Sequence, residues 1–453
     1  MAMKALQRLI SSTLGASAVY ALCATAAGTV QAQSLSTMVE QARGYDAAWL
    51  GAQAQLQAAG SRAEQARAGL LPNAALTGGA NYSRTDMTRG PLPDVKVNSP
   101  GQTVGLQASQ PLYRPANRIG FEQGQRGIDF AQAQLDGAEQ DLLIRVSQAY
   151  FDVLAAQDTL TFVRAQKAAV AEQLAAARRN FEVGTTTVTD EREARARHDL
   201  VTAQEIAADN DLHVKRLALD QLVGRVGTAP VPLAQPVQLP GVQPDDVNNW
   251  VRTSEERQPQ VRQALLALDV AKLETDKAKT GHLPTVDLQA SYNVQRTPNG
   301  TVLMPGVNTR TNVATVGVAV NVPLFAGFSV QNRIKETLAL EEKARADLEN
   351  ARRTVAQAAR TAFFGVQSGL SQVAALQAAE ESSQSALDAN KLGYQVGVRI
   401  NIDVLNAQSQ LYQTKRDLAA ARYNVLVSTL RLKQVAGTLS NADVAAVDAL
   451  LLR

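Results

Sequence analysis

The apolar positions of this chain follow two periods, and each period occurs twice. Long Ala-rich segments with apolar residues at helical spacing alternate with shorter segments in which apolar and polar residues strictly alternate. The first period is typical of amphipathic helices, and the second is typical of strands with one apolar face. The pattern therefore predicts a mainly helical protein with a smaller strand portion, built from two copies of one order of elements.

The first copy contains a helix, a pair of strands and a long helical hairpin. No proline interrupts the helical pattern from Pro115 to Val183, and at 1.5 Å per residue this helix would be about 100 Å long. A proline-containing loop over 87–101 separates the two strands. The predicted elements are, in order, helix 34–70, strands 74–84 and 103–109, and helices 115–183 and 190–223.

The second copy repeats this order. Pro284 and Pro323 lie 212 positions after Pro72 and Pro111, which flank the first strand pair. Its predicted elements are helix 247–279, strands 286–294 and 315–322 with a loop over 297–310, and helices 329–396 and 402–435. The domains predicted are a first repeat over 33–224, a Pro-rich connector over 225–246, a second repeat over 247–437 and a C-terminal tail over 438–453.

The turn of each helical hairpin carries the same short motif. Phe181-Glu-Val-Gly in the first hairpin matches Tyr394-Gln-Val-Gly in the second, 213 positions later. The glycines, Gly184 and Gly397, are expected to close one helix in the left-handed conformation. Thr187 and Asp190 have the spacing of a capping box, and Asn401 is expected to cap the helix that carries Asp403.

The strand pairs have the length of strands that cross a bilayer, which is about ten residues. Four strands cannot close a barrel, and an open edge in lipid leaves backbone groups unsatisfied at several kcal/mol each. Because the smallest transmembrane barrels have about eight strands, two or three copies would be needed. Soluble hairpins remain the alternative. The long helices would continue the wall as a tube, or pack as a solid coiled-coil stalk.

Composition and the N-terminus place the protein outside the cytoplasm. Lys4 and Arg8 precede an apolar run, and Val30-Gln31-Ala32 fits a signal peptidase site, which predicts a signal peptide over 1–32. An uncleaved anchor is the alternative. The only cysteine, Cys23, lies in this segment after Leu22, which disfavours a lipid anchor and excludes disulfides. The formal charge of +3 does not indicate nucleic acid.

Catalytic chemistry is not indicated by the sequence. The three histidines, His198, His213 and His282, are scattered, and the expected mature chain has no cysteine. There is no phosphate-binding glycine loop, no metal-ligand motif, and no basic stripe interleaved with aromatic residues. We therefore expect no enzyme activity, no cofactor or metal, and no nucleic-acid partner.

At this point the chain resembles the TolC family of outer-membrane export channels. The resemblance rests on the duplicated halves, Leu-Pro before each strand pair, the Tyr394-Gln-Val-Gly motif with Asp403-Val-Leu, and Leu411-Tyr412 with Ala421-Arg422-Tyr423-Asn424. It implies a homotrimer in the outer membrane of a Gram-negative bacterium. A twelve-stranded β-barrel would contact outer-membrane lipid, and a twelve-helix α-barrel would extend into the periplasm.

The resemblance also implies a function. Members are exit ducts for an inner-membrane transporter of the ABC or RND class, joined through a periplasmic adaptor, in type I protein secretion or multidrug efflux. The missing lipid anchor slightly favours secretion or a shared channel, while the cargo and the particular transporter stay open. The alternative is a structural trimeric stalk or adhesin without transport activity.

Several sites follow from the resemblance alone. The periplasmic gate latch would be formed by Thr189 and Asp190 of the first hairpin with Tyr394 and Arg399 of the second. The hairpin tips that meet the adaptor would include Val183, Gly184, Val396 and Gly397. The pore constriction would be lined by Asp403 and by Asn406, which stands where relatives often have a second Asp, so we expect a weaker acidic ring that still attracts cations.

Overall fold

A computed structural model of the chain describes residues 33–234, 236–237, 239–301 and 303–452, and the predicted signal peptide lies outside these residues. The chain divides into two compact units. Among the described residues, one unit comprises 33–50, 138–258 and 355–452, and the other comprises 51–137 and 259–354. Each unit therefore combines parts of both sequence repeats.

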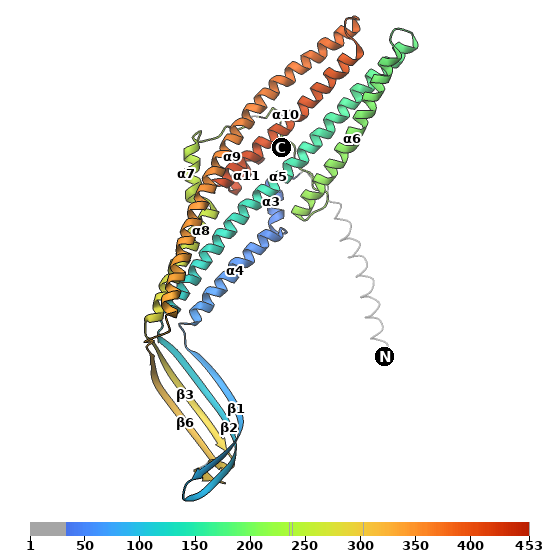
Figure 1. Ribbon diagram of the computed structural model, residues 1–453. Helices are drawn as coiled ribbons and strands as arrows, with labels where there is room; N and C mark the ends of the chain where they lie inside the picture. Colours follow the sequence, from blue (N-terminus) through green and yellow to red (C-terminus); the bar gives the residue numbers. More distant parts are fainter. Residues whose placement is uncertain (1–32, 235, 238, 302, 453) are drawn as a thin grey trace, which may run out of the picture. The chain divides into compact units, whose positions relative to one another are not determined.

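The chain forms two long helical hairpins, and most of their residues belong to the first unit (Figure 1). The first hairpin is formed by α5 (Pro115–Glu182) and α6 (Val188–Val223), and the second by α9 (Ser329–Gln395) and α10 (Asn401–Val435). Their uninterrupted length confirms the prediction from the absence of internal proline. None of the helices in the described part of the chain is long and apolar enough to cross a membrane.

The hairpins are held by apolar side chains at heptad-like spacing. Val163, Val170 and Leu174 of α5 pack against Ala194 and Val201 of α6, and Leu405 of α10 joins the same cluster. The neighbouring residue Val404 packs instead with Leu387 of α9. Because adjacent positions on α10 face different partners, this helix is fixed against both hairpins.

The predicted first helix is wrong in one respect, because it is two helices. α3 (Leu35–Arg43) ends before Gly44, and α4 (Ala47–Ala68) begins after Asp46. The Asp46 carboxylate accepts the Trp49 N–H at 2.8 Å and two Arg145 nitrogens at 2.7 and 3.0 Å. The bond to Arg145 lowers the pKa of Asp46. Capping by a buried, paired carboxylate starts a new helix where the periodicity alone shows no break.

The predicted helix over 247–279 is also two helices, α7 (Val247–Arg257) and α8 (Pro259–Lys279). Gln258 has φ −64° and ψ 128°, an extended conformation that the following proline imposes on the residue before it. Pro259 then serves as the first residue of α8, where its missing N–H has no intrahelical partner to lose. The break coincides with the border between the two units.

The C-terminal tail contains a helix that was not predicted, α11 (Asn441–Asp448). It begins with a capping box formed by Ser440 and Asp443. The Asp448 carboxylate accepts the backbone N–H groups of Leu35 and Ser36 at 2.8 and 3.0 Å. This helix therefore ties the C-terminal segment to the first turn of α3, whose free N–H groups favour an anion.

The second unit carries a four-stranded antiparallel sheet in the order β1-β2-β3-β6. Its strands are β1 (Asn73–Arg89), β2 (Leu92–Tyr113), β3 (Thr285–Thr297) and β6 (Thr309–Asn321). The loop predicted over 87–101 is wrong, since β1 and β2 continue as a two-stranded ribbon to a tight turn. β2 pairs with β3 only from Gln102 onwards. The prolines of β2 that precede Gln102 therefore face β1 alone and interrupt no hydrogen bonds to a second strand. The shorter loop between β3 and β6 holds the two-residue strands β4 (Gly300–Thr301) and β5 (Met304–Pro305).

The two faces of the sheet differ as the alternation predicted. Leu106 is paired with Leu76 and Tyr292 in the register, and these three side chains are exposed on one face. The other face has a hollow of about 440 Å³ that includes Gln107, Ser109, Gln289 and Ser291. Strands β1 and β6 each have one neighbour in this sheet. An apolar exposed face together with two unpaired edges is unstable for a single copy in lipid.

Candidate functional site

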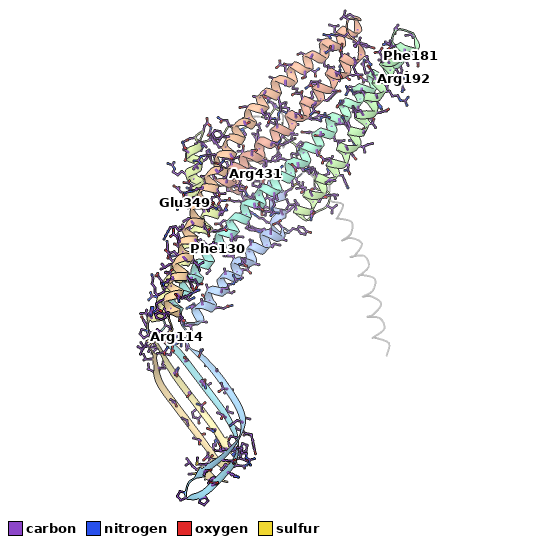
Figure 2. All side chains as sticks on the ribbon, in the orientation of Figure 1. Arg114, Phe130, Phe181, Arg192, Glu349 and Arg431 are labelled. Atoms are coloured by element: carbon purple, nitrogen blue, oxygen red, sulfur yellow. The ribbon has the colours of Figure 1, made fainter. Side chains whose placement is uncertain are left out.

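The tips of the two hairpins have the same backbone geometry. Gly184 and Gly397 have φ values of 76° and 78°, as the sequence predicted. The N–H of Thr185 bonds to the carbonyl of Asn180 at 2.8 Å, and the N–H of Val398 bonds to that of Gly393 at 2.9 Å. These bonds satisfy carbonyls at the end of α5 and α9, so each glycine closes its helix. Figure 2 shows Phe181 at the tip of the first hairpin.

Apolar side chains are exposed at both tips. The predicted tip residues Val183 and Val396 are 71% and 66% exposed. Val398 and Ile400, which the sequence analysis did not single out, are 75% and 61% exposed. The second tip therefore presents three aliphatic side chains to its surroundings, and their burial against a partner would be favourable.

Asp190 belongs to the start of its own helix. Its carboxylate accepts the Thr187 N–H at 3.1 Å and the Thr187 hydroxyl at 2.9 Å, while the Thr187 oxygen accepts the Asp190 N–H at 3.3 Å. The predicted capping box is thus confirmed. Thr189, the other predicted latch residue of the first hairpin, is exposed beside it.

Asn401 does not cap α10 as the sequence predicted. The N-cap is Ile400, with no side-chain capping bond. The Asn401 side chain is instead buried at 1% exposure, where its Nδ2 donates to the Asp190 carbonyl at 3.4 Å and its Oδ1 accepts from Gln173. Asn401 therefore joins α10 to both helices of the first hairpin.

Tyr394 and Arg399, the predicted latch residues of the second hairpin, contact other residues within this chain. The Tyr394 hydroxyl accepts a bond from Asn180 Nδ2 at 3.3 Å, and Arg399 Nη1 lies 3.6 Å from Asp403 Oδ2. Within the described part of one chain, neither residue bonds to Thr189 or Asp190. The four-residue latch stays a prediction, while the structure adds Asn180 as a first-hairpin partner of Tyr394.

The predicted constriction residues lie on one face of α10. Asp403 and Asn406 are three residues apart on α10, and with Arg399 of the preceding turn they line a groove of about 590 Å³ between α9 and α10. The α9 side of this groove is formed by Ser382, Ser383, Ala386 and Asn390. From the first hairpin, Arg197 Nη2 donates to Asn406 Oδ1 at 2.8 Å. Sequence reasoning missed Arg197, because nothing local connects it to a residue 209 positions away.

The groove offers polar groups but no ligand set for a metal. Asp403 is its only acidic residue, and it already pairs with Arg399. Across the described residues, no group of three His, Cys, Asp or Glu side chains is arranged to hold a metal ion. The arrangement is suited to contacts between helices and to interactions with solvent or passing solutes.

Comparisons with known proteins match both repeats. The family described as outer membrane efflux protein matches residues 38–225 and 250–438. The chain is 32% identical to outer membrane protein TolC of Vibrio cholerae, over 95% of this chain and 97% of that protein. It is 31% identical to the proteases secretion protein PrtF of Dickeya chrysanthemi, over 90% and 91%. Its fold is similar to the crystal structure of VceC from Vibrio cholerae, with TM-score 0.76 and 18% identity over 89% and 96%.

Proposed function

The chain belongs to the outer membrane efflux protein family, and from this premise we propose that it works as a homotrimeric channel opened at its periplasmic tip by partner proteins. It is an outer-membrane protein that provides an exit duct for secretion or efflux. The observation that carries this function is the match over both repeats, which includes the helical hairpins and the strand pairs together.

The proposal of three copies follows from the sheet. Each copy contributes four strands with two unpaired edges. Two copies would give eight strands, and a barrel of about eight strands has an interior that side chains fill. Three copies would give twelve strands around a wider interior, and the polar face with its hollow would line it. A duct for cargo therefore favours three.

The partners are proposed from the exposed tips. The chain has no nucleotide-binding motif, so the energy for export must come from another protein. We assign Val183, Gly184, Val396 and Gly397 to contact with a periplasmic adaptor, which would link the duct to an ABC or RND transporter. Among cargoes, we favour proteins, since the relative PrtF is a proteases secretion protein. Small-molecule efflux through the same duct is the second possibility.

The latch is proposed to form between the hairpins of the assembled trimer. Arg399 is 58% exposed at its side chain and 3.6 Å from Asp403, so its guanidinium has donors left for Asp190 of a neighbouring copy. Tyr394 likewise has a hydroxyl proton to donate, since it accepts from Asn180. Such bonds to a carboxylate and to the Thr189 hydroxyl are strong enough to close the tip and weak enough for an adaptor to break.

The test is single-channel conductance of the purified protein in a planar bilayer. Combining Tyr394→Phe with Arg399→Ala removes both donors, so we expect a several-fold larger conductance than in the wild type. Arg192→Ala is the matched control, because Arg192 also lies on the hairpin near its tip (Figure 2) but outside the latch. Unchanged conductance in the double variant would rule out the latch. An inserted oligomer that carries no current in any form would favour the stalk.

A further inference from the structure

The charges on the groove face of α10 are balanced instead of acidic. Asp403 is paired at 3.6 Å with Arg399, which lies four residues earlier in the turn that precedes α10. One turn later the position is Asn406, and Arg197 of α6 donates to its side-chain oxygen at 2.8 Å. The remaining groove residues on both helices are uncharged: Ser382, Ser383, Ala386, Asn390, Ala407 and Gln410.

The bond to Asn406 positions the Arg197 guanidinium beside the groove without pairing it with a negative charge. An amide oxygen accepts a guanidinium N–H but carries no charge, whereas a carboxylate at this position would form an ion pair. Arg197 therefore keeps its full charge beside the groove. Counted with Arg399, Asp403 and the proposed latch acid Asp190, this level of each copy is close to neutral, which differs from an acidic ring.

We propose that the periplasmic constriction of this duct does not select cations, and that Arg197 is a specificity-determining residue which keeps the entrance open to anionic solutes and acidic cargo. The inference rests on the proposed function, because it requires the groove face of α10 to line the pore. Three copies around one axis would place three Arg197 side chains near the narrowest point, where charges act at short range on passing ions.

Arg197 is held in place by the packing on both sides of it. It lies between Ala194 and Val201, whose side chains belong to the apolar cluster shared by α5, α6 and α10. Leu405, the residue before Asn406, belongs to the same cluster. The nearby Arg178 and Glu191 form a pair at 3.4 Å, so they add no net charge. The guanidinium thus reaches Asn406 from a fixed backbone.

The experiment is the reversal potential of single channels in a KCl gradient, using the full mature protein. The wild type should show a cation-to-anion permeability ratio near unity or below it. Arg197→Gln should raise this ratio by at least about threefold, which is the effect of one charge on an ion passing within a few ångströms in water. Arg197→Lys keeps the charge and should leave the ratio unchanged, even if the bond to Asn406 is lost.

The matched control is Arg192→Gln. It removes the same charge from α6, but position 192 lies about 140° around the helix from position 197. The reversal potential should stay at the wild-type value. A loss of structure alone would alter conductance in Arg197→Gln and Arg197→Lys alike without moving the reversal potential.

Each outcome separates the inference from the proposed function. A wild-type channel that strongly prefers cations, or equal ratios in the wild type and Arg197→Gln, overturns the inference while the duct stands. Absence of current from every inserted protein overturns the duct and, with it, the inference. A ratio that rises in Arg197→Gln but not in Arg197→Lys or Arg192→Gln supports both.

Discussion

Asp158 of α5 is an acidic residue buried between the two hairpins. Its carboxylate accepts a 2.7 Å bond from the hydroxyl of Tyr423 on α10, beside a cavity of about 320 Å³. Burial raises the pKa of Asp158 above the usual 3.8, and the bond from Tyr423 offsets only part of this effect. The folded protein therefore holds a proton here more tightly than the unfolded chain does.

This shift has a definite sign for stability. Below the unfolded pKa of 3.8 the Asp158 carboxyl is protonated in both the folded and the unfolded state, so its burial costs least there. As the pH rises from 3.8 towards the folded pKa, the unfolded chain releases this proton first and the protein loses stability. We predict that Asp158→Asn, which keeps an acceptor for Tyr423, raises the thermal denaturation temperature near neutral pH and has little effect below pH 3.8. Melting curves across this pH range test it, and a variant that is less stable near neutral pH would contradict it.

Tyr423→Phe is the companion change and acts in the opposite direction. It leaves the buried carboxylate without its donor, which costs about 1–3 kcal/mol for a lost partner of a buried group. We expect a lower denaturation temperature near neutral pH and a smaller deficit in acid, where Asp158 is protonated. Equal melting of Tyr423→Phe and the wild type near neutral pH would show that the bond contributes nothing.

At the residue scale, sequence motifs identified the residues whose partners lie close to them in the sequence. Gly184 and Gly397 were predicted from helix-ending chemistry, and Asp190 from capping-box spacing, because the groups they serve lie within a few positions. Arg197 and Asn401 act on helices about 200 positions away in sequence. No property of one chain segment reveals such a partner, so the same reasoning assigned Asn401 to a cap that it does not form.

At the scale of elements, α10 carries two heptad columns of opposite character. Apolar residues recur every seventh position at Val404, Leu411, Leu418 and Val425, all of which are buried. Polar residues recur every seventh position at Asn401, Gln408, Lys415 and Arg422. Asn401 and Gln408 of this column are buried, and polar groups in a core seam reduce stability but fix the register of neighbouring helices. The second column thus favours one alignment of α10 against the first hairpin over sliding.

Gln408 tests this interpretation. It is 3% exposed, and its Oε1 has no hydrogen-bond partner among the described residues. Gln408→Leu should therefore stabilise the protein by about 1 kcal/mol, through removal of a buried unpaired acceptor and burial of apolar surface. The change is measured as a higher thermal denaturation temperature. Asn424→Leu, at an exposed position of the same helix, should have little effect, and a destabilised Gln408→Leu would refute the argument.

The elements themselves were predictable wherever the pattern was long and uniform. The bounds of α5, α6, α9 and α10 lie within two residues of those expected, since no proline interrupts these helices after their first residue. The division of 34–70 depended on a bond between Asp46 and Arg145, which the sequence does not show. Pro259 and the Ser440-to-Asp443 capping box were visible, however, and a stricter use of helix-start rules would have found α8 and α11.

For the whole chain, duplication predicted the order of elements but not the compact units. Each repeat supplies a helical hairpin to one unit and a strand pair to the other, because α5 and α9 run through the border between units. A repeat is a unit of sequence, while a compact unit is defined by which elements bury surface together. The repeat boundaries at 225–246 therefore need not be boundaries of folding.

The two edge strands of the sheet, β1 and β6, each need a strand from a neighbouring copy to complete their backbone hydrogen bonds. Residues on the polar face of β1 should lie opposite those of β6 in the next copy. Their Cβ atoms should then be about 3.5–4.5 Å apart, which is the separation that a disulfide needs. The expected mature chain has no cysteine, so pairs can be introduced freely. We predict that one pairing of Ala75→Cys or Thr77→Cys with Thr315→Cys or Ala319→Cys cross-links on oxidation.

The series of cross-linked bands on a denaturing gel should end at three chains, and each single-cysteine variant should remain monomeric. A ladder that ends at two chains would exclude the trimer, and no cross-link in any pairing would show that these edges do not meet.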